Sequence, residues 1–257
     1  MEYLFVFILG SVIGSFLNVC IYRVPNKISI ITPNSFCPNC GTHIPFYYNI
    51  PIISYFMLKG RCHNCHQAIS PRYPVVEFSS GLLTLLTFFK FGFHPAFFFY
   101  GVLVYFLIVI SFIDLSTNLI YNRFLIYLFV FGVVFNLVFH VRPWTSALGG
   151  VVAGGVSLLF FALLGQVIFR KESMGMGDVK FGAVLGFFLG WKMILLALLI
   201  GFVYAMVAMV FYSLIQGKKV AGYVPMAPFL AVGSLTFVYW GPALIAWYWQ
   251  FFLPVQM

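Results

Sequence analysis

Long apolar runs make up most of this chain, and one polar segment separates the first run from the second. The runs long enough to cross a bilayer cover residues 3–22, 75–93, 96–113, 123–139, 146–169, 193–215 and 228–253. A shorter run extends from Val179 to Leu189. Since a ~30 Å core needs about 20 apolar residues, this run either half-spans the membrane or needs Trp191 and the next segment to complete the crossing. The pattern predicts about eight transmembrane helices.

Composition supports this prediction. Hydrophobic residues make up 63% of the chain, charged residues 7%, and the mean hydropathy is +1.03. These values exclude a soluble globular domain and indicate an all-α polytopic membrane protein. We expect the first run to be a retained helix, because Glu2 stands where a signal peptide would be basic. Cys20 within that run is expected to be an ordinary buried thiol.

The distribution of lysine and arginine predicts the orientation. With eight alternating spans, one side holds eleven basic residues and the other holds three, Lys90, Arg142 and Lys192. The eleven are Arg23, Lys27, Lys59, Arg61, Arg72, Arg123, Arg170, Lys171, Lys180, Lys218 and Lys219. Because basic loops stay inside, this side is expected to be cytoplasmic. The net charge of +9 then reflects topology and anionic lipid, and no nucleic-acid partner is expected.

The polar segment contains two CxxC pairs, Cys37-Pro-Asn-Cys40 and Cys62-His-Asn-Cys65. Two such pairs about 20 residues apart are typical of a tetrahedral zinc site in which each pair forms a knuckle. Two disulfides are the alternative, but they are rare in the reducing cytoplasm. Four thiolates leave no open position for water, so the predicted zinc is structural. His43, His63 and His66 are expected to lie at the surface or around the ligands.

Two aspartates stand at the edges of apolar runs, and the chain contains no others. Asp114 ends the 96–113 run, and Asp178 begins the short run, both on the predicted cytoplasmic side. Ionisable groups beside the bilayer core are costly and usually functional. Asp178, Gly182, Gly186 and Gly190 recur every four residues, so they share a helix face on which another helix can approach closely. A similar small-residue face carries Gly150 and Gly154 in the 146–169 run, and another carries Gly10, Gly14 and Asn18 in the first; close packing explains both.

A simpler role is open for Asp178, because aspartate often caps a helix N-terminus. Asp114 is harder to explain in this way, because a carboxylate at a helix C-terminus opposes the helix dipole. A pair of carboxylates, one protonated and one ionised, is what acid–base hydrolysis requires. Glu77 near the start of the second run is either an interfacial anchor paired with Arg72 or a site residue.

The residues together resemble the bacterial type IV prepilin peptidases, a GxGD-type family of intramembrane aspartic proteases. The resemblance covers nearly the whole chain. One departure is Ile120-Tyr121-Asn122, where the family usually has proline at the second position, which loosens the turn without removing a catalytic group. The matching motifs are Gly14-Ser15-Phe16-Leu17-Asn18-Val19, Tyr22-Arg23-Val24-Pro25, the double-CxxC loop with Tyr48-Asn49-Ile50-Pro51 inside it, Arg72-Tyr73-Pro74-Val75-Val76-Glu77, Phe112-Ile113-Asp114-Leu115 and Gly175-Met176-Gly177-Asp178-Val179-Lys180.

This resemblance implies a bifunctional enzyme of the bacterial inner membrane. Asp114 and Asp178 would cleave the leader of prepilin or pseudopilin precursors after a glycine, for a type IV pilus or type II secretion system. The family's second activity methylates the new N-terminus with S-adenosylmethionine, and Glu77 is a candidate there by analogy. We expect a first helix at 1–22, a cytoplasmic zinc-binding domain at 23–74, and a seven-helix membrane domain at 75–257.

Two other classes of function are open. A proton-coupled transporter would also pair carboxylates among helices, but it would show repeated halves and charges near mid-membrane, and no repeat is evident here. A non-catalytic assembly factor with a zinc domain would need neither aspartate.

Overall fold

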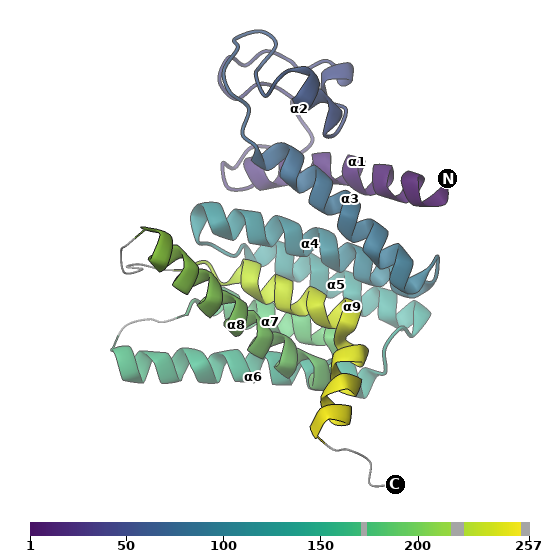
Figure 1. The fold of residues 1–257 in the computed structure, drawn as a ribbon, viewed down its shortest axis with the longest axis vertical. Coiled ribbons are helices and arrows are strands. Elements are labelled where there is room, and N and C mark those ends of the chain that lie inside the picture. Colours follow the sequence, from purple (N-terminus) through teal and green to yellow (C-terminus); the bar gives the residue numbers. More distant parts are fainter. Residues whose placement is uncertain (171–173, 217–223, 253–257) are drawn as a thin grey trace.

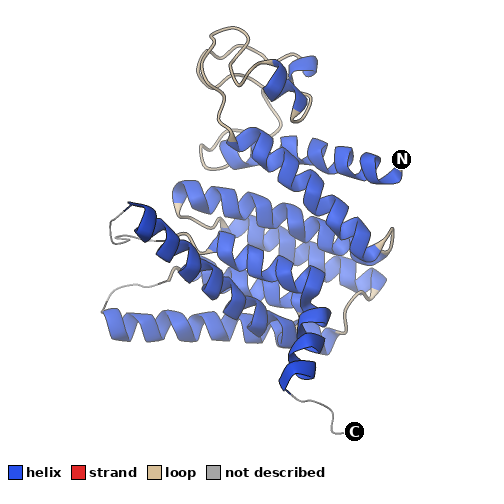
Figure 2. Ribbon diagram, in the orientation of Figure 1, coloured by secondary structure: helices blue, strands red, loops and turns tan. Residues whose placement is uncertain are grey.

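The computed structural model of the chain describes residues 1–170, 174–216 and 224–252, and in these ranges it is helical without any extended strand (Figure 2). Among the described residues, seven helices are long and apolar enough to span a membrane, as predicted. They are α1 (Glu2–Arg23), α3 (Arg72–Phe91), α4 (Pro95–Thr117), α5 (Asn122–Phe139), α6 (Trp144–Phe169), α8 (Trp191–Gln216) and α9 (Ala227–Phe252). Three of the basic residues used to predict orientation, Lys171, Lys218 and Lys219, lie outside the described ranges.

The long helices pack side by side in one bundle (Figure 1). α1 packs on α3, and both contact α4. α4 also contacts α5 and α9, while α6 lies on the far side of the bundle from α1 (Figure 1). α4 therefore lies between the α1–α3 pair and the remaining helices.

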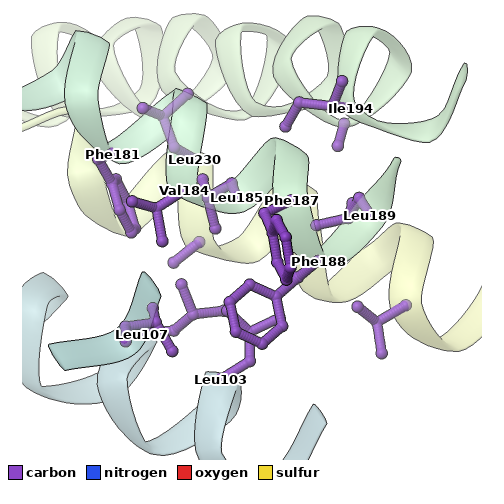
Figure 3. Close-up of a cluster of buried hydrophobic side chains, with 14 of the residues drawn as sticks. Leu103, Leu107, Phe181, Val184, Leu185, Phe187, Phe188, Leu189, Ile194 and Leu230 are labelled. Atoms are coloured by element: carbon purple, nitrogen blue, oxygen red, sulfur yellow. The ribbon is translucent and has the colours of Figure 1, made fainter. Parts of the chain in front are cut away.

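The predicted short run forms a separate helix, α7 (Met176–Leu189), at the centre of this bundle. Ten of its 14 residues are buried. Phe181, Leu185 and Phe187 belong to one apolar cluster that also includes side chains of α4, α8 and α9 (Figure 3). Gly190, with φ of 79°, separates α7 from α8, so the two do not form one continuous helix.

The length of α7 is about 21 Å at ~1.5 Å per residue, less than a hydrocarbon core. Its first residues nevertheless lie at one end of the bundle and its last residues at the other. Gly177 lies against Ile120 at the start of the helix, and Gly190 lies against Arg142 and Ser146 at the other end. A short helix can make this crossing because protein, rather than lipid, surrounds it.

The predicted glycine face of α7 packs directly on the glycine face of α6. A Cβ atom added at Gly150 would overlap the carbonyl oxygen of Gly186, and one at Gly154 would overlap that of Gly182. The backbones of α6 and α7 are therefore in contact, as small-residue faces allow. Gly10 and Gly14 of α1 also pack closely on α3.

Residues 24–71, here called the cysteine module, lie beyond the α1–α3 pair and contain a 3-10 turn, η1 (Phe46–Tyr48), and a short helix, α2 (Ile53–Met57) (Figure 1). Two buried side chains connect the module to the spanning helices. Arg23 donates hydrogen bonds to the carbonyl oxygens of Ser29 (2.9 Å) and Asn34 (3.2 Å). Glu77 on α3 accepts one from the backbone N–H of Ile52 (2.7 Å).

Candidate functional site

Asp114 lies in the last turn of α4 and is only 1% exposed. Its Oδ2 atom accepts a hydrogen bond of 3.0 Å from the backbone N–H of Ala227, the first residue of α9. The carboxylate is unfavourably placed at the C-terminus of its own helix, but it lies at the positive N-terminus of another. The start of α9 therefore explains how a buried carboxylate is held at the end of α4.

Asp178 is the third residue of α7 and is 2% exposed. The N-cap of α7 is Gly175, so Asp178 is not the capping residue that the simpler prediction would have made it. Its backbone N–H donates to the carbonyl oxygen of Gly175 (3.1 Å), which closes the first turn of α7. A carboxylate in the first turn of a helix is favoured by the dipole.

The structure brings these two aspartates together at one end of the bundle, close enough for their charges to interact. They come from α4 and α7, with the start of α9 beside them. The neighbouring Lys180 donates a hydrogen bond from Nζ to Asn122 Oδ1 at the start of α5 (3.2 Å). Two buried carboxylates in one low-dielectric site can divide the roles of acid and base.

The four predicted cysteine ligands meet in the module, with their Sγ atoms all within 4.8 Å of one another. The Sγ atoms of Cys37 and Cys65 are 3.9 Å apart. Thiolates bound to one zinc at ~2.3 Å lie about 3.8 Å apart, whereas a disulfide requires about 2.05 Å. All four cysteines are free, so the structure fits a tetrahedral metal site and excludes the disulfide alternative.

The two CxxC pairs form near-identical turns. In the first, the N–H of Cys37 donates to Thr42 O (2.9 Å), and in the second the N–H of Cys62 donates to Gln67 O (2.9 Å). The asparagine of each pair reaches across to the other: Asn39 Nδ2 lies 3.6 Å from Cys65 Sγ, and Asn64 Nδ2 lies 3.8 Å from Cys40 Sγ. Each turn therefore supports the thiolates of its partner.

Two thiols of the cluster differ in acidity. Hydrogen bonds with the Thr42 side chain and backbone, and a further one from Asn64, lower the pKa of Cys40 to about 6. Burial raises the pKa of Cys37 to about 11. A bound metal cation would stabilise both as thiolates, because coordination deprotonates a thiol.

Glu77 lies apart from the aspartate pair and does not form an ion pair with Arg72. Its Oε2 accepts the Ile52 N–H instead, and Ser15 also donates to its carboxylate. Ile52 has φ of 65° and ψ of −54°, and the next N–H, of Ile53, bonds back to Pro51 O (2.6 Å). A tight turn of this hand is strained for a β-branched residue. The buried carboxylate thus holds a strained turn beside the cysteine module.

Two groups that contribute to these sites were not predicted from the sequence. The start of α9 at Ala227 pairs with Asp114; the apolar run from residue 228 and Pro228 predicted a helix that begins there, but not its contact with Asp114. Asn18 was assigned to close packing, yet its side chain is 2% exposed and donates to the carbonyl oxygen of Tyr73 (3.1 Å).

Comparisons with known proteins indicate one family, and the matches cover most of the chain. Residues 8–91 match the bacterial peptidase A24 N-terminal domain, and residues 101–213 match the type IV leader peptidase family. Relatives named prepilin leader peptidase/N-methyltransferase come from several bacteria. The Legionella pneumophila protein is 30% identical, covering 96% of this chain and 94% of its own length. The Pseudomonas aeruginosa protein is 30% identical (95% and 92% covered), and the Neisseria gonorrhoeae protein is 32% identical (83% and 83%). No solved structure matches.

Proposed function

Because this chain belongs to the type IV prepilin leader peptidase family, we propose that it removes the leader peptide of prepilin-like precursors by aspartic proteolysis. The observation that supports this most directly is the meeting of Asp114 and Asp178, the chain's two aspartates, at one buried location. The cleaved bond follows the leader's terminal glycine, and the residue after it begins the apolar pilin helix. Prepilins or pseudopilins are the proposed partners.

The two carboxylates divide the chemistry between them. One, ionised, removes a proton from water as the water attacks the scissile carbonyl. The other, protonated, donates a hydrogen bond to the carbonyl oxygen and stabilises the charge that develops there. Asp114 is held for this task by the N–H of Ala227 (3.0 Å), so the start of α9 is a positioning element. Burial in the bundle keeps both groups out of bulk water.

Asparagine substitutions test this proposal. Asp114→Asn and Asp178→Asn each replace one carboxylate oxygen by an NH₂ group, which makes an uncharged amide and retains the volume of the side chain. Asparagine at 114 also keeps an oxygen that can accept from Ala227. We expect either change to lower prepilin cleavage by purified enzyme at least ~100-fold, because the loss of a general acid or base costs about two to four orders of magnitude.

Glu2→Gln is the matched control, because Glu2 is an exposed carboxylate in the first turn of α1. Cleavage by this variant should equal that of the unmodified enzyme, and all three variants should unfold at similar temperatures. Full cleavage by a folded Asp114→Asn or Asp178→Asn enzyme would refute the assignment.

The proposal includes N-methylation of the new N-terminus, the second activity in the names of the relatives. S-adenosylmethionine would supply a sulfonium-borne methyl group to the uncharged amine, with release of S-adenosylhomocysteine and one proton. Glu77 is the proposed contributor, since it is a buried carboxylate beside the cysteine module. Zinc held by Cys37, Cys40, Cys62 and Cys65 would stabilise that module without taking part in the chemistry.

The seven spans and the family support a multi-pass protein of the inner membrane. The bias of basic residues supports placing the cysteine module and both aspartates at its cytoplasmic face. A substrate with a cytoplasmic leader would then present its cleavage site at this end of the bundle.

A further inference from the structure

A cavity of about 470 Å³ lies between the cysteine module and the adjoining parts of α1 and α3. All of its lining residues fall between Ser15 and Glu77, so neither Asp114 nor Asp178 contributes to it. The volume is in the range of sites that bind small molecules, roughly 300–1,000 Å³. The cavity is thus a site separate from the aspartate pair.

Asn18 on α1 gives this cavity an unsatisfied acceptor. Its Nδ2 donates to the Tyr73 carbonyl oxygen (3.1 Å), which can only accept and therefore sets the orientation of the amide. Its Oδ1 atom is buried and has no hydrogen-bond partner. Because an unmade hydrogen bond of a buried polar atom is costly, this atom indicates a ligand that carries a donor.

Charged groups of both signs line the same cavity. Arg72 contributes a buried Nε atom that has no hydrogen-bond partner, while its guanidinium carbon lies 5.5 Å from the centre of the Tyr73 ring. Glu77 contributes a carboxylate, held by Ser15 and Ile52. An anionic acceptor near Arg72 and a cationic donor near Asn18 and Glu77 would complement these atoms. An amino-acid zwitterion carries both.

Aromatic residues line much of the rest. Tyr22, Phe36, Tyr48, Tyr55 and Tyr73 all contribute to the lining. Aromatic faces stack on nucleobases and attract organic cations. A ligand that combines a base, a cationic centre and an amino-acid zwitterion would use every kind of group present.

We infer that this cavity binds the methyl donor S-adenosylmethionine, with Asn18 and Glu77 at its amino group, Arg72 at its carboxylate and the tyrosine rings against its adenosine. This inference rests on the proposed N-methylation. It adds Asn18 and Arg72 to Glu77 and assigns all three to recognition of the amino-acid part of the donor. Proteolysis and donor binding then occupy different places at the same end of the bundle.

Direct binding tests the inference without any catalytic readout. Calorimetric titration of the full-length, detergent-purified protein would measure two ligands, S-adenosylhomocysteine and 5′-methylthioadenosine, which lacks the amino-acid part. We expect the unmodified protein to bind the first at least tenfold more tightly than the second, because only the first offers groups to Asn18, Arg72 and Glu77.

Two variants test the named residues. Glu77→Gln removes the charge but retains an oxygen for the Ile52 N–H, and Asn18→Leu removes the polar atoms at similar volume. Each should weaken S-adenosylhomocysteine binding at least tenfold and change methylthioadenosine binding less than threefold. Glu2→Gln should change neither, and thermal unfolding of each variant would show that it is folded.

The outcomes separate this inference from the functions it rests on. If the protein binds S-adenosylhomocysteine and the folded variants bind it equally well, the cavity assignment is wrong while N-methylation stands. No binding by the unmodified protein would overturn both the cavity assignment and the proposed methyl transfer, and the Asp114 and Asp178 variants would still test proteolysis independently. Equal loss of both ligands in the variants would contradict recognition of the amino-acid part.

Discussion

At the scale of single residues, three buried polar side chains of this protein hold backbone groups of segments distant in the sequence. Asp114 holds the N–H of Ala227, Glu77 holds that of Ile52, and Asn18 holds the carbonyl oxygen of Tyr73. Buried polar groups are costly unless they are paired. Each of these pairs joins the start or end of a helix, or a strained turn, to a spanning helix, so these residues position segments of the chain.

Metal content can be predicted at the same scale. Purified protein should contain about one zinc ion per chain, measured by mass spectrometry of the metal. Cys37→Ser should lose most of it, because three ligands no longer satisfy a closed tetrahedral site. Cys20→Ser is the matched control, since Cys20 is buried in α1 outside the cluster. Equal zinc in both variants would contradict the assignment of the four ligands.

At the scale of helices, α6 and α7 are in direct backbone contact at Gly150 and Gly186. No side chain lies between the helices there to absorb a change in spacing. The position of Asp178 in the first turn of α7 therefore depends on how closely α7 rests on α6.

A single methyl group tests this dependence. Gly150→Ala would place its Cβ on the Gly186 carbonyl oxygen, and we expect a loss of roughly 1–3 kcal/mol, or about 2–10 °C in the midpoint of thermal unfolding. Gly101→Ala is the matched control, because a Cβ at Gly101 on α4 meets no atom within 4 Å. An unchanged midpoint for Gly150→Ala, with cleavage intact, would show that α6 and α7 can separate without consequence.

At the scale of the whole molecule, the helices alternate in direction, so one end of the bundle gathers the cysteine module, both aspartates and the start of α9 (Figure 1). The bias of basic residues predicts that this end faces the cytoplasm. The loop at Gly92, between α3 and α4, then lies on the periplasmic side.

Reporter fusions test that orientation. Alkaline phosphatase is active only in the periplasm, so we expect high activity when it is fused after Gly92 and background activity when it is fused after Lys59 in the cysteine module. The reverse pattern would place the aspartates on the wrong side for a cytoplasmic leader. Comparable expression of both fusions, measured by immunoblotting, is the control.

The sequence was sufficient to predict the seven spans, the close approach at the glycine face of the short helix and the cysteine cluster, because periodicity and spacing express these directly. It left open whether the short helix continues into the next span, which the backbone at Gly190 decides. The hydrogen bond from the Ala227 N–H to Asp114 could not be predicted, because almost every residue type carries a backbone N–H. The positive φ of Ile52 was equally hidden, because a β-branched residue predicts the opposite backbone conformation. Asn18 resembled a packing residue because its partner, the Tyr73 carbonyl oxygen, comes from another helix.

The shortness of α7 has a consequence for biosynthesis. A segment of 14 residues is a poor stop for the translocation machinery on its own, since it cannot bridge a full hydrocarbon core. α6 leaves the ribosome before it and carries the glycine face on which α7 packs. Entry of the two as a hairpin would keep the carboxylate of Asp178 from ever facing bare lipid.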